Sequence, residues 1–113
     1  MQRALEAYFE DTLNAIEKIE RYTLGMSKEE LNQNEMVLDA VVRNLEIIGE
    51  VVKKIPVEVR VEYSDIPWRK IAGLRDILIH EYFGININII WDVIENKLSP
   101  LKKTMMDLLN DNS

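Results

Sequence analysis

The segment 35–54 constrains the fold most, because its apolar residues cover well over half of a helical circumference. Charged side chains share the narrow arc that remains. A helix that is apolar over so much of its surface is buried on more than one side. We therefore expect other helices to surround it and, in a chain of 113 residues, we also expect contact with a partner. The apolar set, which ends just beyond the segment, is Val37, Leu38, Ala40, Val41, Val42, Leu45, Ile47, Ile48, Val51, Val52 and Ile55.

The N-terminal part of the chain predicts one long helix and one short one. Over 3–23, apolar residues recur at three- and four-residue steps, and Gly25 is expected to end this helix. Ser27 followed by Glu30 forms a capping-box pattern, which predicts a short helix over 28–33. The core face of the first helix is expected to be Leu5, Phe9, Thr12, Ile16 and Ile19, with Tyr8, Ala15 and Tyr22 beside it.

A connector and a central helix are expected next. The segment 57–63, after the break at Pro56, alternates apolar and charged residues as a strand does. No other segment could pair with a strand, so we expect a short helical or extended connector. The central helix is expected to run without interruption over 67–84, because it begins with a proline and ends with a glycine. Ser64 or Asp65 is its expected cap.

The C-terminal part predicts a further helix followed by a short last one. The further helix is expected to be capped by Asn86 or Asn88 and to reach about Leu98. Ser99 is expected to cap the last helix, with Pro100 in its first turn. The expected fold is therefore all-α, an up-and-down bundle of four main helices with short additional ones, forming a single domain over 1–113.

Composition limits the classes of function. No apolar run approaches the ~20 residues that cross a bilayer, and the charged N-terminus argues against a signal peptide. We expect a cytoplasmic protein that binds no membrane and no DNA. The net charge of −6 argues against a broad nucleic-acid-coating surface but allows a local basic patch. Arg60, Arg69 and Lys70 form a candidate RNA-guiding cluster, for which simple surface solvation is the alternative.

The anomaly of the central helix is an arginine in its apolar stripe. Six residues fall within about 60° of Arg75 on a helical projection. A buried arginine without a partner costs roughly 3–5 kcal/mol, so something must pair with Arg75 or use it. Glu46 or Glu50 of the preceding long helix is the candidate for a structural ion pair. The six apolar residues are Trp68, Ile71, Ala72, Leu78, Ile79 and Tyr82.

The only histidine of the chain, His80, follows five residues after Arg75. That spacing is about 140° of helical rotation, so the two side chains leave a regular helix in different directions. Either the helix ends near His80 or a second chain contributes, if both are to serve one substrate. Asp76 lies one turn before His80, and Tyr82 returns to the Arg75 face. A lone histidine at a helix end is otherwise a cap or core residue.

Arg75, His80 and Tyr82 form a pattern in which four residues separate the arginine from the histidine and one residue separates the histidine from the tyrosine. This pattern resembles the signature of the HEPN superfamily and specifically of the HepT-like (DUF86) toxin family. Similar matches at consistent spacing extend over nearly the whole chain, and no signature position departs from the pattern. The matching stretches are Arg43-Asn-Leu-Glu46-Ile-Ile-Gly49-Glu50, Ile66-Pro67-Trp68, Ile89-Ile90-Trp91 and Leu98-Ser-Pro-Leu101. Arg43, Glu46 and Glu50 would form a polar face of the second long helix.

The resemblance implies a metal-independent endoribonuclease that acts as the toxin of a toxin–antitoxin pair. The residues fit that chemistry, because RNA supplies its own 2′-OH nucleophile and needs only proton transfer and a cation beside the phosphorus. His80 would move the protons, Arg75 would stabilise the charge, and Asp76 would orient the imidazole. One histidine and scattered carboxylates give no metal-ligand cluster, so no metal and no cofactor are expected.

The resemblance also implies a homodimer with two facing motifs, which would supply two histidines and two arginines to a shared site. It further implies a minimal nucleotidyltransferase antitoxin that adenylylates Tyr82, and a nucleotide there would occupy the phosphate site and pair with Arg75. The competing interpretation is a non-catalytic module that binds nucleotides or proteins and partners a nucleotidyltransferase. In that case Arg75 would be a structural or phosphate-binding residue, and Tyr82 a stacking or core aromatic.

Overall fold

The structure, a computed structural model, describes residues 3–80 and 86–111 of the chain, without the side chains at 77, 79, 80 and 111. Every regular element in those ranges is helical, so the expected all-α class is confirmed. The elements are α1 (Arg3–Thr23), α2 (Lys28–Gln33), α3 (Glu35–Val52), α4 (Val57–Glu62), α5 (Trp68–Ala72), α6 (Leu74–His80), α7 (Ile87–Asp92), the π-helical turn η1 (Val93–Lys97) and α8 (Leu98–Asp111).

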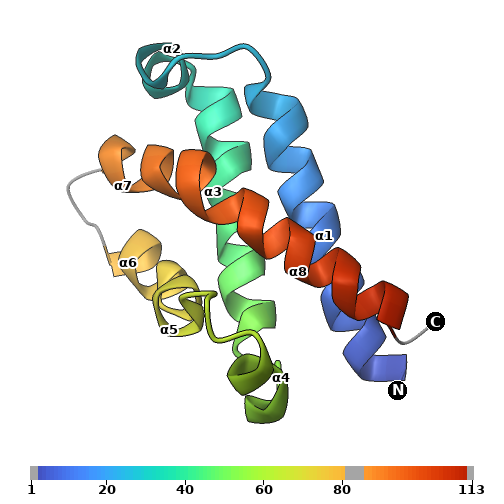
Figure 1. Cartoon of the computed structure of the whole chain (residues 1–113). Coiled ribbons are helices and arrows are strands. Elements are labelled where there is room, and N and C mark those ends of the chain that lie inside the picture. Colours follow the sequence, from blue (N-terminus) through green and yellow to red (C-terminus); the bar gives the residue numbers. More distant parts are fainter. Residues whose placement is uncertain (1–2, 81–85, 112–113) are drawn as a thin grey trace.

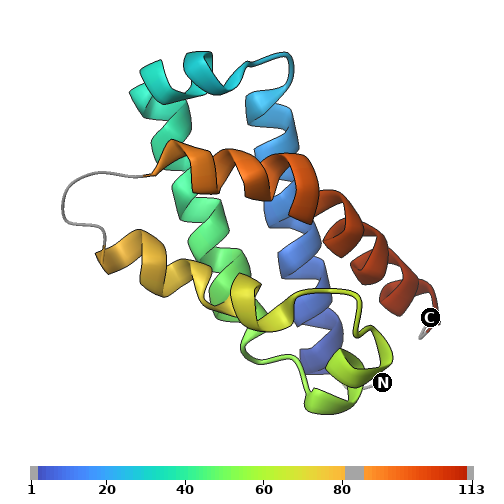
Figure 2. The ribbon, with the colours of Figure 1, turned by 60° about the vertical axis from the view of Figure 1, so that its left-hand side comes forward.

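The long helices α1 and α3 lie side by side and run in opposite directions (Figure 1). The segment from α7 through α8 crosses this pair, and α5 and α6 pack against α3 (Figure 2). The core fills the space between these layers and is made of fully buried side chains, among them Phe9, Ile16, Ile19, Leu45, Ile48, Leu101 and Met105. In the described ranges, no helix has both the length and the apolar character needed to cross a bilayer.

The predicted helix boundaries in the N-terminal half are confirmed where a specific capping residue marks them. Gly25 follows α1 with a φ of 78°, a left-handed conformation that glycine adopts without strain. Ser27 accepts from the backbone N–H of Glu30, whose carboxylate accepts from the backbone N–H of Ser27, at 3.1 Å in both directions. Two otherwise unpaired backbone donors are thereby satisfied at the start of α2. The connector after Pro56 is helical rather than extended.

The expectation of one continuous helix over 67–84 is wrong. The chain turns at Gly73, which separates α5 from α6, and the part of the prediction over 81–84 lies outside the described residues. Neither expected cap is used, because Pro67 takes the N-cap position and no side chain bonds there. Glycine is about 1 kcal/mol less favourable than alanine within a helix, so the interruption falls where the helix is weakest.

Close packing against α3 accompanies this interruption. A Cβ atom on Gly49 would lie 3.2 Å from the carbonyl oxygen of Ile71 and 3.3 Å from the backbone nitrogen of Arg75. Only a residue without a side chain lets α3 approach the α5–α6 junction so closely. Gly49 therefore sets the position of the first turn of α6, which carries Arg75.

The boundary expected near Leu98 lies within one residue of the junction of η1 and α8, and Pro100 is in the first turn of α8 as expected, but the expected break with a cap at Ser99 is wrong. Asn86 caps α7, as expected, but the chain then continues through η1 directly into α8. Pro100 lies in the first turn of α8, immediately after the π-helical turn. The regular backbone hydrogen-bond pattern is already shifted in that turn, since Leu98 donates to the carbonyl of Val93. We attribute the tolerance of the missing proline N–H to this shift.

The wide apolar arc of α3 is largely covered within the chain itself. One side of α3 packs on α1, and another side packs on α5 and α6. The buried residues of α3 are Val41, Asn44, Leu45, Ile48, Gly49, Val51 and Val52. Burial on two sides thus follows from the chain's own helices, and the width of the arc is not in itself an argument for a second chain.

Candidate active site

Arg75 lies at the edge of its helix and not in the middle of the core-facing stripe, so the expected burial is wrong. The side chain keeps 43% of its exposure, whereas Trp68, Ile71 and Leu74 fill the core. The break at Gly73 and the close approach of α3 rotate the buried face toward Leu74. The expected stripe residues Ile79 and Tyr82 cannot be compared, because their side chains are outside the described residues.

The partner of Arg75 is Glu50, one of the two carboxylates expected. Nε of Arg75 lies 3.0 Å from Oε2 of Glu50 in an ion pair, and the Glu50 side chain is 50% exposed. An ion pair this exposed contributes only about 0.2–1 kcal/mol to stability. Within the described part of the chain Arg75 has no second charged partner, so its remaining N–H groups can meet an anion from solution. The pair thus orients the guanidinium more than it stabilises the fold.

The polar face predicted for α3 is present and faces the same space. Nη1 of Arg43 lies 3.9 Å from Oε2 of Glu46, and the Arg43 side chain is 72% exposed. A hollow of about 320 Å³, here called the Arg75 hollow, is lined by Arg43, Glu46, Ile47, Glu50, Val51 and Arg75. The three site candidates of α3 and Arg75 therefore meet at one concave surface.

Asp76 and His80 share α6 but are not shown in contact. Oδ1 of Asp76 lies 4.0 Å from Nζ of Lys53, and the Asp76 side chain is 60% exposed. His80 is the last residue of α6, and its side chain lies outside the described residues, as does the whole of Tyr82. The predicted orientation of the imidazole by Asp76, and the predicted place of the phenol, therefore stay predictions. Among the described residues, no three His, Cys, Asp or Glu side chains gather as metal ligands.

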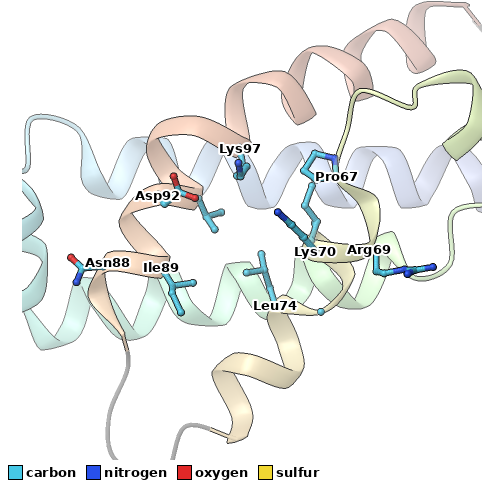
Figure 3. A pocket seen from close by; sticks show the side chains of 11 residues that line it. Pro67, Arg69, Lys70, Leu74, Asn88, Ile89, Asp92 and Lys97 are labelled. Carbon is cyan, nitrogen blue, oxygen red and sulfur yellow. The ribbon is translucent and has the colours of Figure 1, made fainter.

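A second and larger cavity lies on the other side of the α5–α6 junction (Figure 3). It measures about 720 Å³, is here called the basic-rimmed cavity, and separates α5 and α6 from α7 and η1. Sequence reasoning singled out Lys70 and Arg69 but missed Lys97, which reaches the same rim from η1. The lining residues are Pro67, Arg69, Lys70, Ile71, Gly73, Leu74, Asn88, Ile89, Asp92, Val93 and Lys97.

The third member of the basic cluster suggested by the sequence does not belong to this rim. Arg60 donates to the backbone carbonyl of Val52 over 2.7 Å and to that of Ile55 over 3.0 Å. Those bonds satisfy carbonyls at and just beyond the C-terminus of α3, where the helix dipole also favours a cation. Arg60 is therefore a structural residue of the α3–α4 connection, and the grouping of Arg60 with Arg69 and Lys70 is wrong.

The structure defines the class as an all-α helical bundle that presents an arginine at a concave polar surface, five residues before the chain's histidine. Comparison with known proteins makes the assignment specific. Residues 12–108 match the sequence profile described as Ribonuclease HepT-like, and the chain belongs to that family.

Relatives with known descriptions support the same assignment. A protein of Caldanaerobacter subterraneus subsp. tengcongensis named as a putative RNase is 43% identical, over 90% of this chain and 91% of its own length. A Thermococcus cleftensis protein named as a probable ribonuclease HepT is 39% identical, over 90% of this chain and 93% of its own. A gamma-glutamylcyclotransferase and putative RNase of Methanocaldococcus jannaschii is 35% identical over 98% of this chain, which spans only 50% of that protein. No solved structure matches the chain significantly.

Proposed function

We propose that this chain is a metal-independent endoribonuclease that acts in the cytoplasm, with Arg75 and His80 as its catalytic residues. Membership of the Ribonuclease HepT-like family supports the activity. The observation that best supports the proposed site is the half-exposed guanidinium of Arg75, which pairs with Glu50 and lines the Arg75 hollow. Arg75 belongs to α6, the helix that ends at His80. Its planar fork fits two oxygens of a phosphate and stays charged at every working pH.

The proposed reaction is an attack by the RNA on its own backbone. His80 takes the proton from a 2′-OH, the 2′ oxygen bonds to the adjacent phosphorus, and the bond from phosphorus to the 5′ oxygen breaks. A proton delivered to that 5′ oxygen completes the step, giving a 2′,3′-cyclic phosphate and a 5′-hydroxyl. Arg75 would stabilise the extra negative charge on the phosphate oxygens while bonds to phosphorus change. Asp76, one turn before His80, would orient the imidazole and favour its protonated form.

We propose that the site is completed by a second copy of the chain. Arg75 and His80 both belong to α6, and a regular helix directs residues at this spacing about 140° apart. Two copies that face each other across a two-fold axis would bring the arginine of one helix near the histidine of the other and supply a second proton-transfer group. Mixed dimers of wild-type and His80→Ala chains should therefore be slower than wild-type homodimers. Equal rates would contradict the shared site.

We further propose that the enzyme is the toxin of a toxin–antitoxin pair, silenced by a minimal nucleotidyltransferase that adenylylates Tyr82. Tyr82 follows two residues after His80 in the sequence, so an anionic nucleotide on it could reach the arginine that the substrate needs. Intact mass after incubation with the partner and ATP tests this step. An adenylyl adduct on wild type that is missing in Tyr82→Phe is expected, and an adduct that persists in Tyr82→Phe would contradict the assignment.

The activity itself is tested with purified protein, a fluorescent RNA pool and excess EDTA. Wild type should cleave, whereas Arg75→Ala and His80→Ala should not. Arg21→Ala on α1 is the matched control, because it removes an exposed arginine that does not line the Arg75 hollow. Equal cleavage by all four proteins would point to a contaminating nuclease and refute the site.

The second candidate function is a binding module that partners a nucleotidyltransferase without cutting RNA. The Arg75 hollow is compatible with such a module, because an arginine beside two carboxylates can hold a nucleotide phosphate or a partner side chain. This alternative predicts partner or nucleotide binding that depends on Arg75, with no RNA cleavage by any variant.

A further inference from the structure

The basic-rimmed cavity lies outside the Arg75 hollow and plays no part in the proposed reaction. Its volume of about 720 Å³ is within the range of roughly 300–1,000 Å³ that is usual for sites of small ligands. Figure 3 shows Leu74 of α6 and Ile89 of α7 facing each other across it. Ile71 of α5 and Val93 of η1 line the cavity from opposite sides and are both buried, so the floor of the cavity is aliphatic. Such a floor suits a flat apolar surface rather than a strongly polar group.

The rim carries cations that the structure leaves without a counter-ion. Lys70 of α5 and Lys97 of η1 come from opposite walls of the cavity, whereas Arg69 extends away from it (Figure 3). Within residues 3–80 and 86–111, neither lysine forms an ion pair, although the chain as a whole has a net charge of −6. Two unpaired lysines that converge on one opening in an acidic protein attract an anion from outside the chain.

Among the described residues, the acidic group on the rim, Asp92, forms no ion pair with Lys70 or Lys97, although its negative charge lies at the same cavity. Oδ1 of Asp92 accepts from the side-chain amide of Asn96 over 2.7 Å, and the carbonyl of the Asn88 side chain accepts from Lys28 over 3.0 Å. Asp92 and Asn88 thus place polar atoms beside the aliphatic floor. Hydroxyls and base edges are the kinds of groups such atoms can bind.

We propose that the basic-rimmed cavity binds one nucleotide of the RNA substrate, outside the cleavage site, with its phosphate between Lys70 and Lys97 and its base against the aliphatic floor. Lysine is suited to a phosphate as a compact point charge. The assignment rests on the proposed ribonuclease function for its choice of RNA. A peptide partner with acidic and apolar side chains is less well matched, because the charges converge on one point of a compact cavity and do not follow an extended groove.

The position of the cavity relates it to the reaction. Leu74 lines the cavity and Arg75, the next residue, lines the Arg75 hollow, so the first turn of α6 separates the two spaces. A strand that crosses this turn can hold one phosphate at Arg75 and a neighbouring nucleotide in the cavity. The nucleotide would anchor the strand and contribute to affinity rather than to the chemical step.

Binding of a labelled, uncleavable 2′-fluoro RNA decamer to the full chain tests the proposal by fluorescence anisotropy. The double variant Lys70→Gln/Lys97→Gln should weaken binding about tenfold and lower the slope of affinity against salt by about 0.7, the value for one phosphate on a single strand. Ile89→Trp, which fills the cavity without a change of charge, should weaken binding similarly. Lys103→Gln on α8 is the control, with an expected change below about twofold.

Several results would overturn the proposal. One is RNA affinity unchanged in both cavity variants while thermal melting shows them folded. Another is AMP that binds as tightly as the decamer, which would assign the cavity to a free nucleotide. A third is loss of nucleotidyltransferase binding in the lysine variant with unchanged RNA affinity, which would assign it to a protein. Because the RNA is uncleavable, a chain that binds as predicted but never cuts natural RNA would refute the ribonuclease proposal alone.

Discussion

The Arg75 hollow and the basic-rimmed cavity, which both lie beside the first turn of α6, differ in how their charges are balanced. In the Arg75 hollow, cations and carboxylates alternate and are paired, with Glu50 at 3.0 Å from Arg75 and Glu46 at 3.9 Å from Arg43. In the basic-rimmed cavity, Lys70 and Lys97 face an aliphatic floor without a charged partner among the described residues. Paired charges hold a guanidinium in a fixed direction, which suits chemistry, whereas unpaired charges attract a ligand, which suits binding.

The largest effect is expected in the Arg75 hollow, where it tests the proposed role of Arg75 in the chemical step. Arg75→Ala should lower kcat for RNA cleavage by at least about 10²–10³, the range seen when a group that stabilises transition-state charge is removed. Arg75→Lys should restore only part of the rate, because an ammonium cannot present two parallel donors. Single-turnover cleavage assays measure both. A full rate in Arg75→Lys would mean that only net charge matters at this position.

Gly49→Ala tests whether the close approach of α3 positions the α5–α6 junction, which lies between the Arg75 hollow and the basic-rimmed cavity. The added Cβ would press on the carbonyl of Ile71 and the backbone nitrogen of Arg75, at 3.2 and 3.3 Å. We expect a net loss of about 1 kcal/mol, because overpacking of about 1–3 kcal/mol exceeds the gain in helix propensity. Thermal melting measures the stability, and cleavage should fall about tenfold as Arg75 shifts.

Gly73→Ala is the matched control for that variant. Gly73 has a φ of −77°, which any residue adopts, and its added Cβ would approach mainly the carbonyl of Arg69 within the same short helix, at 3.3 Å. We expect a smaller change in melting temperature than for Gly49→Ala. The reverse order would show that contact between α3 and the junction does not position α6.

A smaller effect is expected from the residue that orients Arg75. Glu50→Ala should lower kcat about fivefold and leave the melting temperature nearly unchanged, because an exposed ion pair contributes only about 0.2–1 kcal/mol. Glu50→Gln keeps an acceptor for Nε of Arg75 and should retain most of the rate. A faster enzyme in Glu50→Ala would show instead that Glu50 competes with the substrate phosphate for Arg75.

The smallest effect is expected in the basic-rimmed cavity, where it tests the proposed role of Lys70 in RNA binding. Lys70→Gln alone should raise KM for a short RNA about threefold and leave kcat unchanged, because uniform binding contributes equally to ground and transition states. Steady-state cleavage at two salt concentrations measures this, and the effect should shrink at higher salt. A fall in kcat with unchanged KM would place Lys70 with Arg75 in the chemical step.

Local signals in the sequence predicted the features that depend on a few neighbouring residues. The capping box of Ser27 and Glu30, the helix over 3–23 and its end just before Gly25 depend on local sequence, and the structure has them as predicted. The sequence left Glu46 and Glu50 as the two candidate partners of Arg75, and the structure pairs Arg75 with Glu50. The prediction missed the break at Gly73 and placed a break with a cap at Ser99 where the chain stays helical, because proline and glycine mark possible breaks and packing decides which of them are used.

The sequence by itself determined the helical class, the N-terminal caps and the motifs that relate the chain to its family, because each depends on residue types at fixed short spacings along the chain. Only the tertiary structure decided that Arg75 is half-exposed, since its exposure depends on the approach of α3 at Gly49 to the break after Ala72. It alone also brought Lys70 and Lys97 to one cavity, because helices distant in sequence form its two walls. Periodicity fixes which face of a helix is apolar, and the packing of neighbouring helices fixes which parts of that face stay open to a ligand.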